Sequence, residues 1–109
     1  MSEYFPGVQK IKYEGPDSKN PFAFRHYHAK AVVRGKTMAE HLRLAVCYWH
    51  TFKGLGGDPF GPRTIIRNYN DSSDPMEVAN MTLDVAFEFF TELGVGFWCF
   101  HERIVADKR

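Results

Sequence analysis

Three side chains of this sequence, His101, Trp49 and Phe60, have types and positions that suit chemistry or ligand binding. His101 ends the apolar run 95–100, where a neutral imidazole could accept a proton while a partner holds its other nitrogen. The alternative is a polar residue that merely ends a buried strand. Trp49, taken by its sequence context alone, is a core aromatic. Phe60 lies among glycines and prolines that offer little local burial, which favours an interface role.

The other histidines and the cysteines carry weaker signals. His26 and His28 have an HxH spacing that could bind a metal, but their loop-rich context and the lack of a nearby acidic cluster favour solvated side chains. Cys47 and Cys99 each lie in an apolar run, so we expect buried thiols of a reducing compartment rather than a disulfide. No CxxC or Cys/His spacing typical of zinc sites is present. The sequence therefore predicts no metal ligand in this chain.

Composition restricts the classes of partner. The chain has 109 residues, enough for one small domain, and a formal net charge of +1 without a long run of one sign. Nucleic acid would need a clustered basic face, so we expect no such partner. No apolar stretch approaches the roughly 18 residues of a membrane span, and we expect a soluble, cytoplasmic protein. The aromatic content of 16% is high and indicates that the chain buries surface against something.

The first half of the chain predicts an irregular arm, a short helix and a strand. Residues 1–36 are rich in proline, glycine and other turn formers, so we expect a loop-like arm. Thr37 and Glu40 fit a capping box, which predicts a helix over about 37–43. The apolar run that follows predicts a strand over about 45–52, covered on both faces as in a parallel sheet.

The second half predicts a long loop, a helix and a second strand. Residues 53–73 include a stretch rich in glycine and proline and predict a long loop. Asp74 as N-cap, Pro75 at the first helical position and Gly94 after the last turn delimit an amphipathic helix. A second buried strand should follow over about 96–101. This order predicts a right-handed βαβ unit with both strand ends and the long loop at one edge.

A unit of this kind is incomplete by itself. Two parallel strands with apolar faces do not close a sheet, and each leaves an exposed edge. We therefore expect the chain either to assemble with copies of itself or to form part of a larger barrel.

Long strings of the sequence resemble the longer-chain class of the xylose isomerase (glucose isomerase) family. The matching strings are EGPDSKNPFAFRHY at 14–27, GKTMAEHLRLAVCYWHTF at 35–52, DPFG at 58–61, DPMEVA at 74–79, and DVAFEFFTELGV followed by CFH at 84–95 and 99–101. The similarity covers nearly the whole chain and corresponds to the N-terminal quarter of a typical family chain. It ends just after the strand that carries the family's catalytic histidine.

The resemblance implies an α/β fold class, specifically a partial TIM-type (β/α)8 barrel. Residues 1–109 would then form a single partial domain, with 1–36 as the arm and 37–109 as the first strand–helix–strand unit. Such enzymes form tetramers and interconvert aldoses and ketoses, D-xylose with D-xylulose and D-glucose with D-fructose. They use two divalent metals, Mg²⁺, Mn²⁺ or Co²⁺, in a metal-assisted hydride shift.

The same resemblance implies roles for three residues. His101 would be catalytic, contacting the ring oxygen or the O1 hydroxyl of the sugar and assisting ring opening. Trp49 matches a substrate-binding aromatic that walls the sugar site, where a ring packs well on carbon-bound hydrogens. Phe60 matches the aromatic that the family inserts into the site of a neighbouring subunit.

The sequence also departs from the family. After His101 come Glu102, Arg103 and Ile104, where the family typically has Asp, any residue, and an Asp that orients the histidine. Gly54 replaces a family tryptophan. The family's metal ligands and catalytic lysine lie on later strands and are missing from this chain.

Three hypotheses follow. The first is an aldose–ketose isomerase that acts when assembled with itself or with other subunits. The second is a non-catalytic truncated relative that oligomerises or docks onto a full-length subunit. The third is a small sugar-binding module that uses Trp49 and His101.

Overall fold

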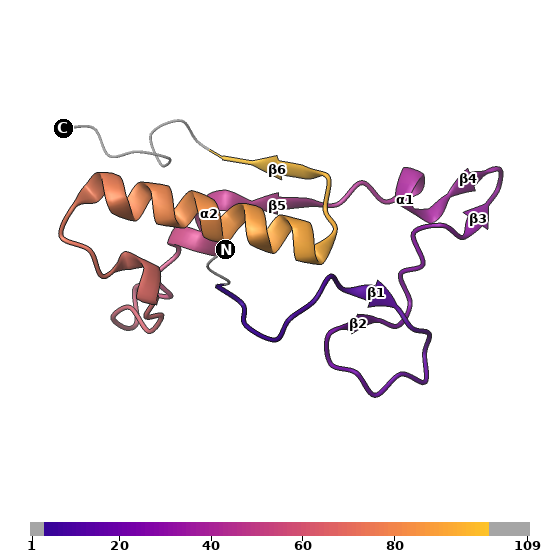
Figure 1. The fold of residues 1–109 in the computed structure, drawn as a ribbon, viewed down its shortest axis with the longest axis horizontal. Helices are drawn as coiled ribbons and strands as arrows, with labels where there is room; N and C mark the ends of the chain where they lie inside the picture. Colours follow the sequence, from indigo (N-terminus) through magenta and orange to yellow (C-terminus); the bar gives the residue numbers. More distant parts are fainter. Residues whose placement is uncertain (1–3, 101–109) are drawn as a thin grey trace.

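The computed structural model describes residues 4–100, and its longest element is the helix α2, Pro75–Leu93 (Figure 1). The Asp74 carboxylate caps the helix by accepting a hydrogen bond from a backbone N–H of the first turn at 2.9 Å. Gly94 ends it with a φ of 78°, in the left-handed region, and donates its N–H to a carbonyl of the last turn at 2.9 Å. Both predicted ends are confirmed, because capping signals are local.

The helix α2 connects two parallel strands, β5 at Ala45–Cys47 and β6 at Phe97–Cys99. Val46 lies opposite Trp98, and Cys47 lies opposite Cys99. Figure 1 shows the two strands side by side, with α2 running along them. The predicted order of strand, loop, helix and parallel strand is confirmed, and the described chain is a small mixed α/β structure.

The first strand is shorter than the predicted 45–52. At Tyr48 the backbone turns helical (φ −58°, ψ −49°), and the π-helix η1 covers Trp49–Lys53. This turn brings the rings of Tyr48 and Phe52 to 5.6 Å from each other, and both side chains are buried. In an extended strand residues four apart would be separated by about 13 Å. Packing of the two rings therefore outweighed the β propensity of this segment.

The second strand is shorter than the predicted 96–101 and is not buried. All three residues of β6 are exposed, although the ring of Trp98 contacts Phe87 and Phe90 of α2. The prediction of a buried strand is wrong for β6, and the first strand, β5, is not covered on both faces, since Ala45 is exposed; the long helix α2 packs against one face of the pair. Position 101 of the predicted strand lies outside the described residues.

A single hydrophobic core joins α2, β5 and η1. Its buried members are Val46, Tyr48, Phe52, Tyr69, Val85, Ala86 and Phe90. Tyr69 belongs to the short 3₁₀-helix η2, Asn68–Asn70, and its hydroxyl donates a hydrogen bond to the carbonyl of Phe52 at 3.0 Å. The buried positions of α2 confirm the predicted amphipathic helix.

The arm contains short strands that the sequence analysis did not predict. The strand β1, Lys12–Tyr13, pairs in parallel with β2, Ala23–Phe24. Strands of two residues carry no periodic signal, so the prediction of a wholly irregular arm over 1–36 is wrong at these positions. Figure 1 shows this part of the arm beyond the C-terminal end of α2.

The arm ends in a hairpin of β3, Val32–Val33, and β4, Lys36–Thr37. Its two turn residues, Arg34 and Gly35, have φ values of 51° and 80°. A type I′ hairpin turn requires positive φ at both central positions, and glycine adopts such values without strain. The hairpin leads directly into the next helix.

The short helix α1, Met38–His41, confirms the helix predicted over about 37–43, although it is shorter. Its capping box is reciprocal. The Glu40 N–H donates to the Thr37 hydroxyl at 3.2 Å, and the Thr37 N–H donates to the Glu40 carboxylate at 2.7 Å. The hydrogen bonds that the Thr37 N–H and then the Thr37 hydroxyl donate to the Glu40 carboxylate lower the pKa of that group.

Hydrogen bonds attach the arm to α2. The backbone N–H groups of Tyr4 and Phe5 both donate to the Glu88 carboxylate at 3.0 Å. The N–H of Ile11 donates to the carbonyl of Glu92 at 2.7 Å. The arm thus lies across the helix instead of extending freely from it.

Candidate functional site

The two parallel strands end at the same level, because Cys47 is the register partner of Cys99. Trp49 follows Cys47 by two residues, and His101 follows Cys99 by two residues. Because parallel strands that end in register bring the segments after them to one end of the sheet, Trp49 lies at that end, as the first residue of the π-helix η1. His101 itself lies outside the described residues, as do the family departures at 102–104.

Trp49 begins the π-helix η1 and is 42% exposed. Its indole packs edge-on against the ring of His50, with centroids 4.5 Å apart, and His50 is also exposed. The interpretation of Trp49 as a core aromatic is therefore wrong. The core position is taken by Tyr48, one residue earlier. The exposed indole is available for contact with a ligand or another chain.

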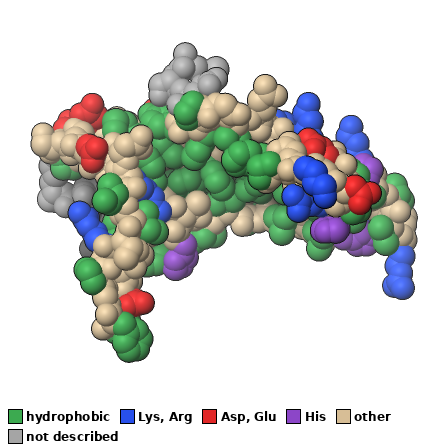
Figure 2. All heavy atoms as spheres, turned by 90° about the horizontal axis from the view of Figure 1, so that it is seen from below, with side chains coloured by type: hydrophobic (Ala, Val, Ile, Leu, Met, Phe, Trp, Pro, Cys, Tyr) green, Lys and Arg blue, Asp and Glu red, His purple; other side chains and the backbone are tan. Residues whose placement is uncertain are grey.

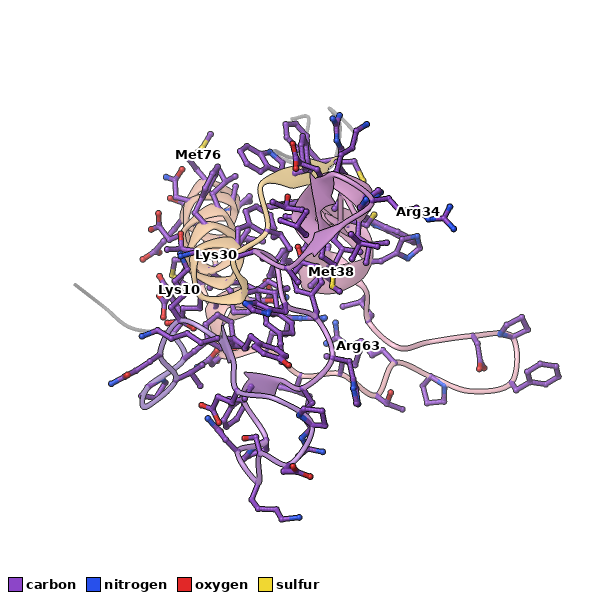
Figure 3. All side chains as sticks on the ribbon, turned by 90° about the vertical axis from the view of Figure 1, so that its right-hand side faces the viewer. Lys10, Lys30, Arg34, Met38, Arg63 and Met76 are labelled. Carbon is purple, nitrogen blue, oxygen red and sulfur yellow. The ribbon has the colours of Figure 1, made fainter. Side chains whose placement is uncertain are left out.

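Phe60 lies in the long loop predicted after the first strand and is 96% exposed. Its N–H donates to the Asp58 side chain at 2.8 Å, and Asp58 pairs with Gly61 in an isolated antiparallel bridge. Figure 3 shows the loop around Arg63 extending away from the body of the molecule. The tight turn holds the aromatic outward, as expected for an interface residue.

Hydrogen bonds also hold the base of this loop. The Arg67 guanidinium donates to the carbonyls of Gly54 and Thr51, the latter at 2.9 Å. The N–H groups of Thr64 and Ile65 donate to the carbonyl of Leu55 at 3.0 and 3.1 Å. The base of the loop, which follows Trp49 closely in the sequence, is therefore held by hydrogen bonds. Phe60 projects from this base.

The cysteines are free, as predicted, but the prediction of burial is wrong for Cys99. Cys99 is exposed and Cys47 is half-buried, because their face of the sheet is opposite to α2. Loss of hydration and then a hydrogen bond with Cys47 raise the pKa of the Cys99 thiol.

The HxH histidines do not form a site. His26 and His28 are both exposed, in agreement with solvated side chains, and His28 stacks on Tyr13 with ring centroids 4.4 Å apart. Over residues 4–100, no group of three or more histidine, cysteine, aspartate or glutamate side chains is placed to hold a metal ion.

A pocket of about 340 Å³ opens at the opposite end of the strands, where the arm meets the sheet. Phe24, Tyr27, Leu42, Leu93 and Phe97 are among its lining residues. Sequence reasoning missed this pocket because its walls come from segments far apart in the chain. It lies at the N-terminal end of β5 and β6, away from Trp49.

Hydrophobic side chains are exposed both in the lining of this pocket and outside it. Figure 2 shows them gathered in the middle of one face of the molecule, between two projecting ends. Leu42, Leu44, Phe97 and Trp98 all expose more than two fifths of their surface. Contiguous exposed apolar surface is typical of regions that bind protein, membrane or ligand.

The fold and the site define a class. Within residues 4–100, a parallel strand–helix–strand unit with a long loop after its first strand defines a small mixed α/β fold. No protein-family model matches the chain. The chain is 55% identical over 108 residues to the xylose isomerase of Mannheimia succiniciproducens and 56% identical over 108 residues to that of Marinomonas sp.. It is 52% identical over 106 residues to that of Caldanaerobacter subterraneus subsp. yonseiensis.

These matches cover 97–99% of this chain and 24–25% of each relative. The resemblance is thereby confirmed: the chain is similar to the N-terminal quarter of xylose isomerases, and it spans about a quarter of their length. Within residues 4–100, no helix is long and apolar enough to cross a membrane.

Proposed function

We propose that this chain supplies the first strand–helix–strand unit of a xylose-isomerase-type (β/α)8 barrel and contributes to aldose–ketose isomerisation in the cytoplasm. In this proposal residues 1–36 are the arm and 37–109 the barrel unit. The observation that carries it is the parallel pair β5–β6, whose ends lie level two residues before Trp49 and His101. In barrels of this class, site residues belong at the C-terminal ends of the strands.

The substrate we propose is an aldose or ketose sugar, such as D-xylose or D-glucose. The exposed indole of Trp49 offers a flat apolar face on which carbon-bound hydrogens of a sugar can pack. His101 would accept or hold a proton at the ring oxygen or the O1 hydroxyl and so assist ring opening. The two residues would wall one side of the sugar.

A divalent cofactor, Mg²⁺, Mn²⁺ or Co²⁺, is suggested by the relation to xylose isomerases. When bound, such an ion polarises sugar oxygens as a Lewis acid. The residues at 4–100 do not fit one, since no suitable cluster is present among them. We therefore assign the metal ligands to strands that this chain does not contain and derive no step through the metal from its residues.

The unit needs further strands to act. Both strands of the pair have an unpaired edge in the described structure, and β6 is exposed on its whole length. Two strands cannot close a barrel. We propose that further subunits, copies of this chain or related chains, supply the remaining strands, and that Phe60 contacts a neighbouring subunit.

Complementation tests the proposal. The purified chain is mixed with a Mannheimia succiniciproducens xylose isomerase that lacks its N-terminal quarter, and xylulose is measured in a coupled assay with xylose and each of the three metals. We expect metal-dependent xylulose from the mixture and none from the truncated relative alone. His101→Ala in the chain should abolish it, whereas Phe22→Ala, an exposed aromatic on the arm, should not.

The outcomes separate the hypotheses. Sedimentation of the same mixture reports whether the two proteins associate. Association without any xylulose would contradict the isomerase and favour a docking protein. Absence of both association and xylulose, for the mixture and for the chain alone, would contradict the barrel unit itself.

A further inference from the structure

We infer that Cys47 and Cys99 form an accessible dithiol across β5 and β6, which a hydroperoxide converts to a disulfide that joins the two strands. This inference does not depend on the proposed function. It concerns the only two cysteines in the sequence, both of which are free thiols in the structure.

The register places the two residues within reach of a disulfide. Cys47 is the direct partner of Cys99 in the parallel pair. Neighbouring strands lie about 4.7–4.9 Å apart, within the range of about 4.4–6.8 Å found between Cα atoms of bonded cysteines. The Cys99 sulfur also lies 3.9 Å from the carbonyl of Val46 on the other strand, so it leans toward β5.

The pair is accessible from the face of the sheet opposite to α2. Val46 and Trp98, the preceding partners in the ladder, face the helix, since Val46 is in the core and Trp98 contacts α2 rings. Alternation then turns Cys47 and Cys99 to the other face. Cys99 is exposed and Cys47 half-buried, so a small peroxide can reach at least one sulfur.

The reaction balances in two steps. One thiolate attacks the terminal oxygen of the hydroperoxide, which leaves a sulfenic acid and releases an alcohol, or water from hydrogen peroxide. The second thiol attacks that sulfur, forms the S–S bond and expels water. The two thiols lose two electrons in total, and the peroxide oxygen–oxygen bond is reduced.

The reaction should accelerate with rising pH. The pKa of Cys99 is raised by its loss of hydration and by the neighbouring Cys47, so its thiolate forms at higher pH than in a free cysteine. Exposed disulfides are readily reduced, so the bond should form and break reversibly.

Mass spectrometry tests the inference on the intact 109-residue chain. The protein is treated with hydrogen peroxide, alkylated and analysed. We expect a monomer that has lost two hydrogen atoms and resists alkylation, and that regains both thiols with a reductant. In the folded chain the sulfenic acid should be converted to the disulfide about tenfold faster than in urea, because fixed proximity raises the effective concentration of the second thiol.

Two matched variants and one probe complete the design. Cys47→Ser and Cys99→Ser each leave one thiol and should give no intramolecular product, with circular dichroism to verify the fold. Phenylarsine oxide, which bridges paired thiols, should block both cysteines at one molecule per chain. Independent alkylation of both thiols after peroxide, disulfides only between chains, or equal rates in urea would each overturn the inference.

Discussion

The two faces of the β5–β6 pair differ in what they contact. On one face Val46 is buried in the core, and the Trp98 ring stacks on Phe90 with centroids 5.4 Å apart and planes 10° apart. On the other face Cys47 is half-buried and Cys99 is exposed. The helix-covered face therefore holds the fold together, while the opposite face is left for association or chemistry. Four predictions test how far this division extends.

The largest effect is expected at Phe90 on the covered side. It is 4% exposed and contacts the rings of Phe52, Phe87 and Trp98. Phe90→Ala should lower the free energy of unfolding by about 3–5 kcal/mol, because it leaves a cavity where helix and sheet meet. Urea denaturation followed by circular dichroism measures the loss. Phe87→Ala, at a position 48% exposed, is the control and should cost clearly less; equal losses would contradict the division.

The second largest loss of stability is expected at Glu88, on the side of α2 that contacts the arm. The Glu88 carboxylate accepts hydrogen bonds from the N–H groups of Tyr4 and Phe5. Glu88→Ala should cost about 1–3 kcal/mol and release the arm, because charge-assisted bonds are lost from two backbone donors. Hydrogen exchange at these two amides should become faster. Unchanged protection would show that side-chain packing, not Glu88, holds the arm.

Tyr48 has an unsatisfied polar group on the helix-covered side. Its hydroxyl is buried and has no hydrogen-bond partner among the described residues, and burial raises its pKa. Tyr48→Phe should raise the free energy of unfolding by about 1 kcal/mol, because it removes an unsatisfied polar group and keeps the ring. The urea midpoint reports the change. A lower midpoint would mean that the hydroxyl has a partner in solution.

The smallest effect is expected on the opposite face. Cys99→Ser replaces an exposed thiol, so the free energy of unfolding should change by less than about 0.5 kcal/mol. The same urea titration measures it. A loss comparable to that of Phe87→Ala would show that this face is covered in solution, for example by a second copy of the chain.

Local signals explain which parts of the fold could be predicted. The ends of α2 were predictable from Asp74 and Gly94, and the start of α1 from Thr37 and Glu40, because caps act within one turn. The strand lengths were not, since the bend at Tyr48 depends on the burial of Tyr48 and Phe52 against a helix that begins over twenty residues later. The two-residue strands of the arm give no repeating pattern to detect.

For the candidate site too, some features could be predicted from the sequence and others could not. Residue types and family strings selected Trp49 and Phe60, and the structure places both at exposed positions. The pairing of Cys47 with Cys99 could not be predicted, because register depends on how two distant strands align and not on either segment. The pocket between the arm and the strands was missed for the same reason.

The sequence by itself determined the relation to xylose isomerases, the capped helices and the order of strand, loop, helix and parallel strand, because these depend on residue identity and on contacts near in the chain. The tertiary structure alone decided which face of the sheet is covered, where the first strand stops and that the two cysteines lie opposite each other. Those features arise from packing between segments far apart in the chain, where burial of aromatic rings outweighs local propensity.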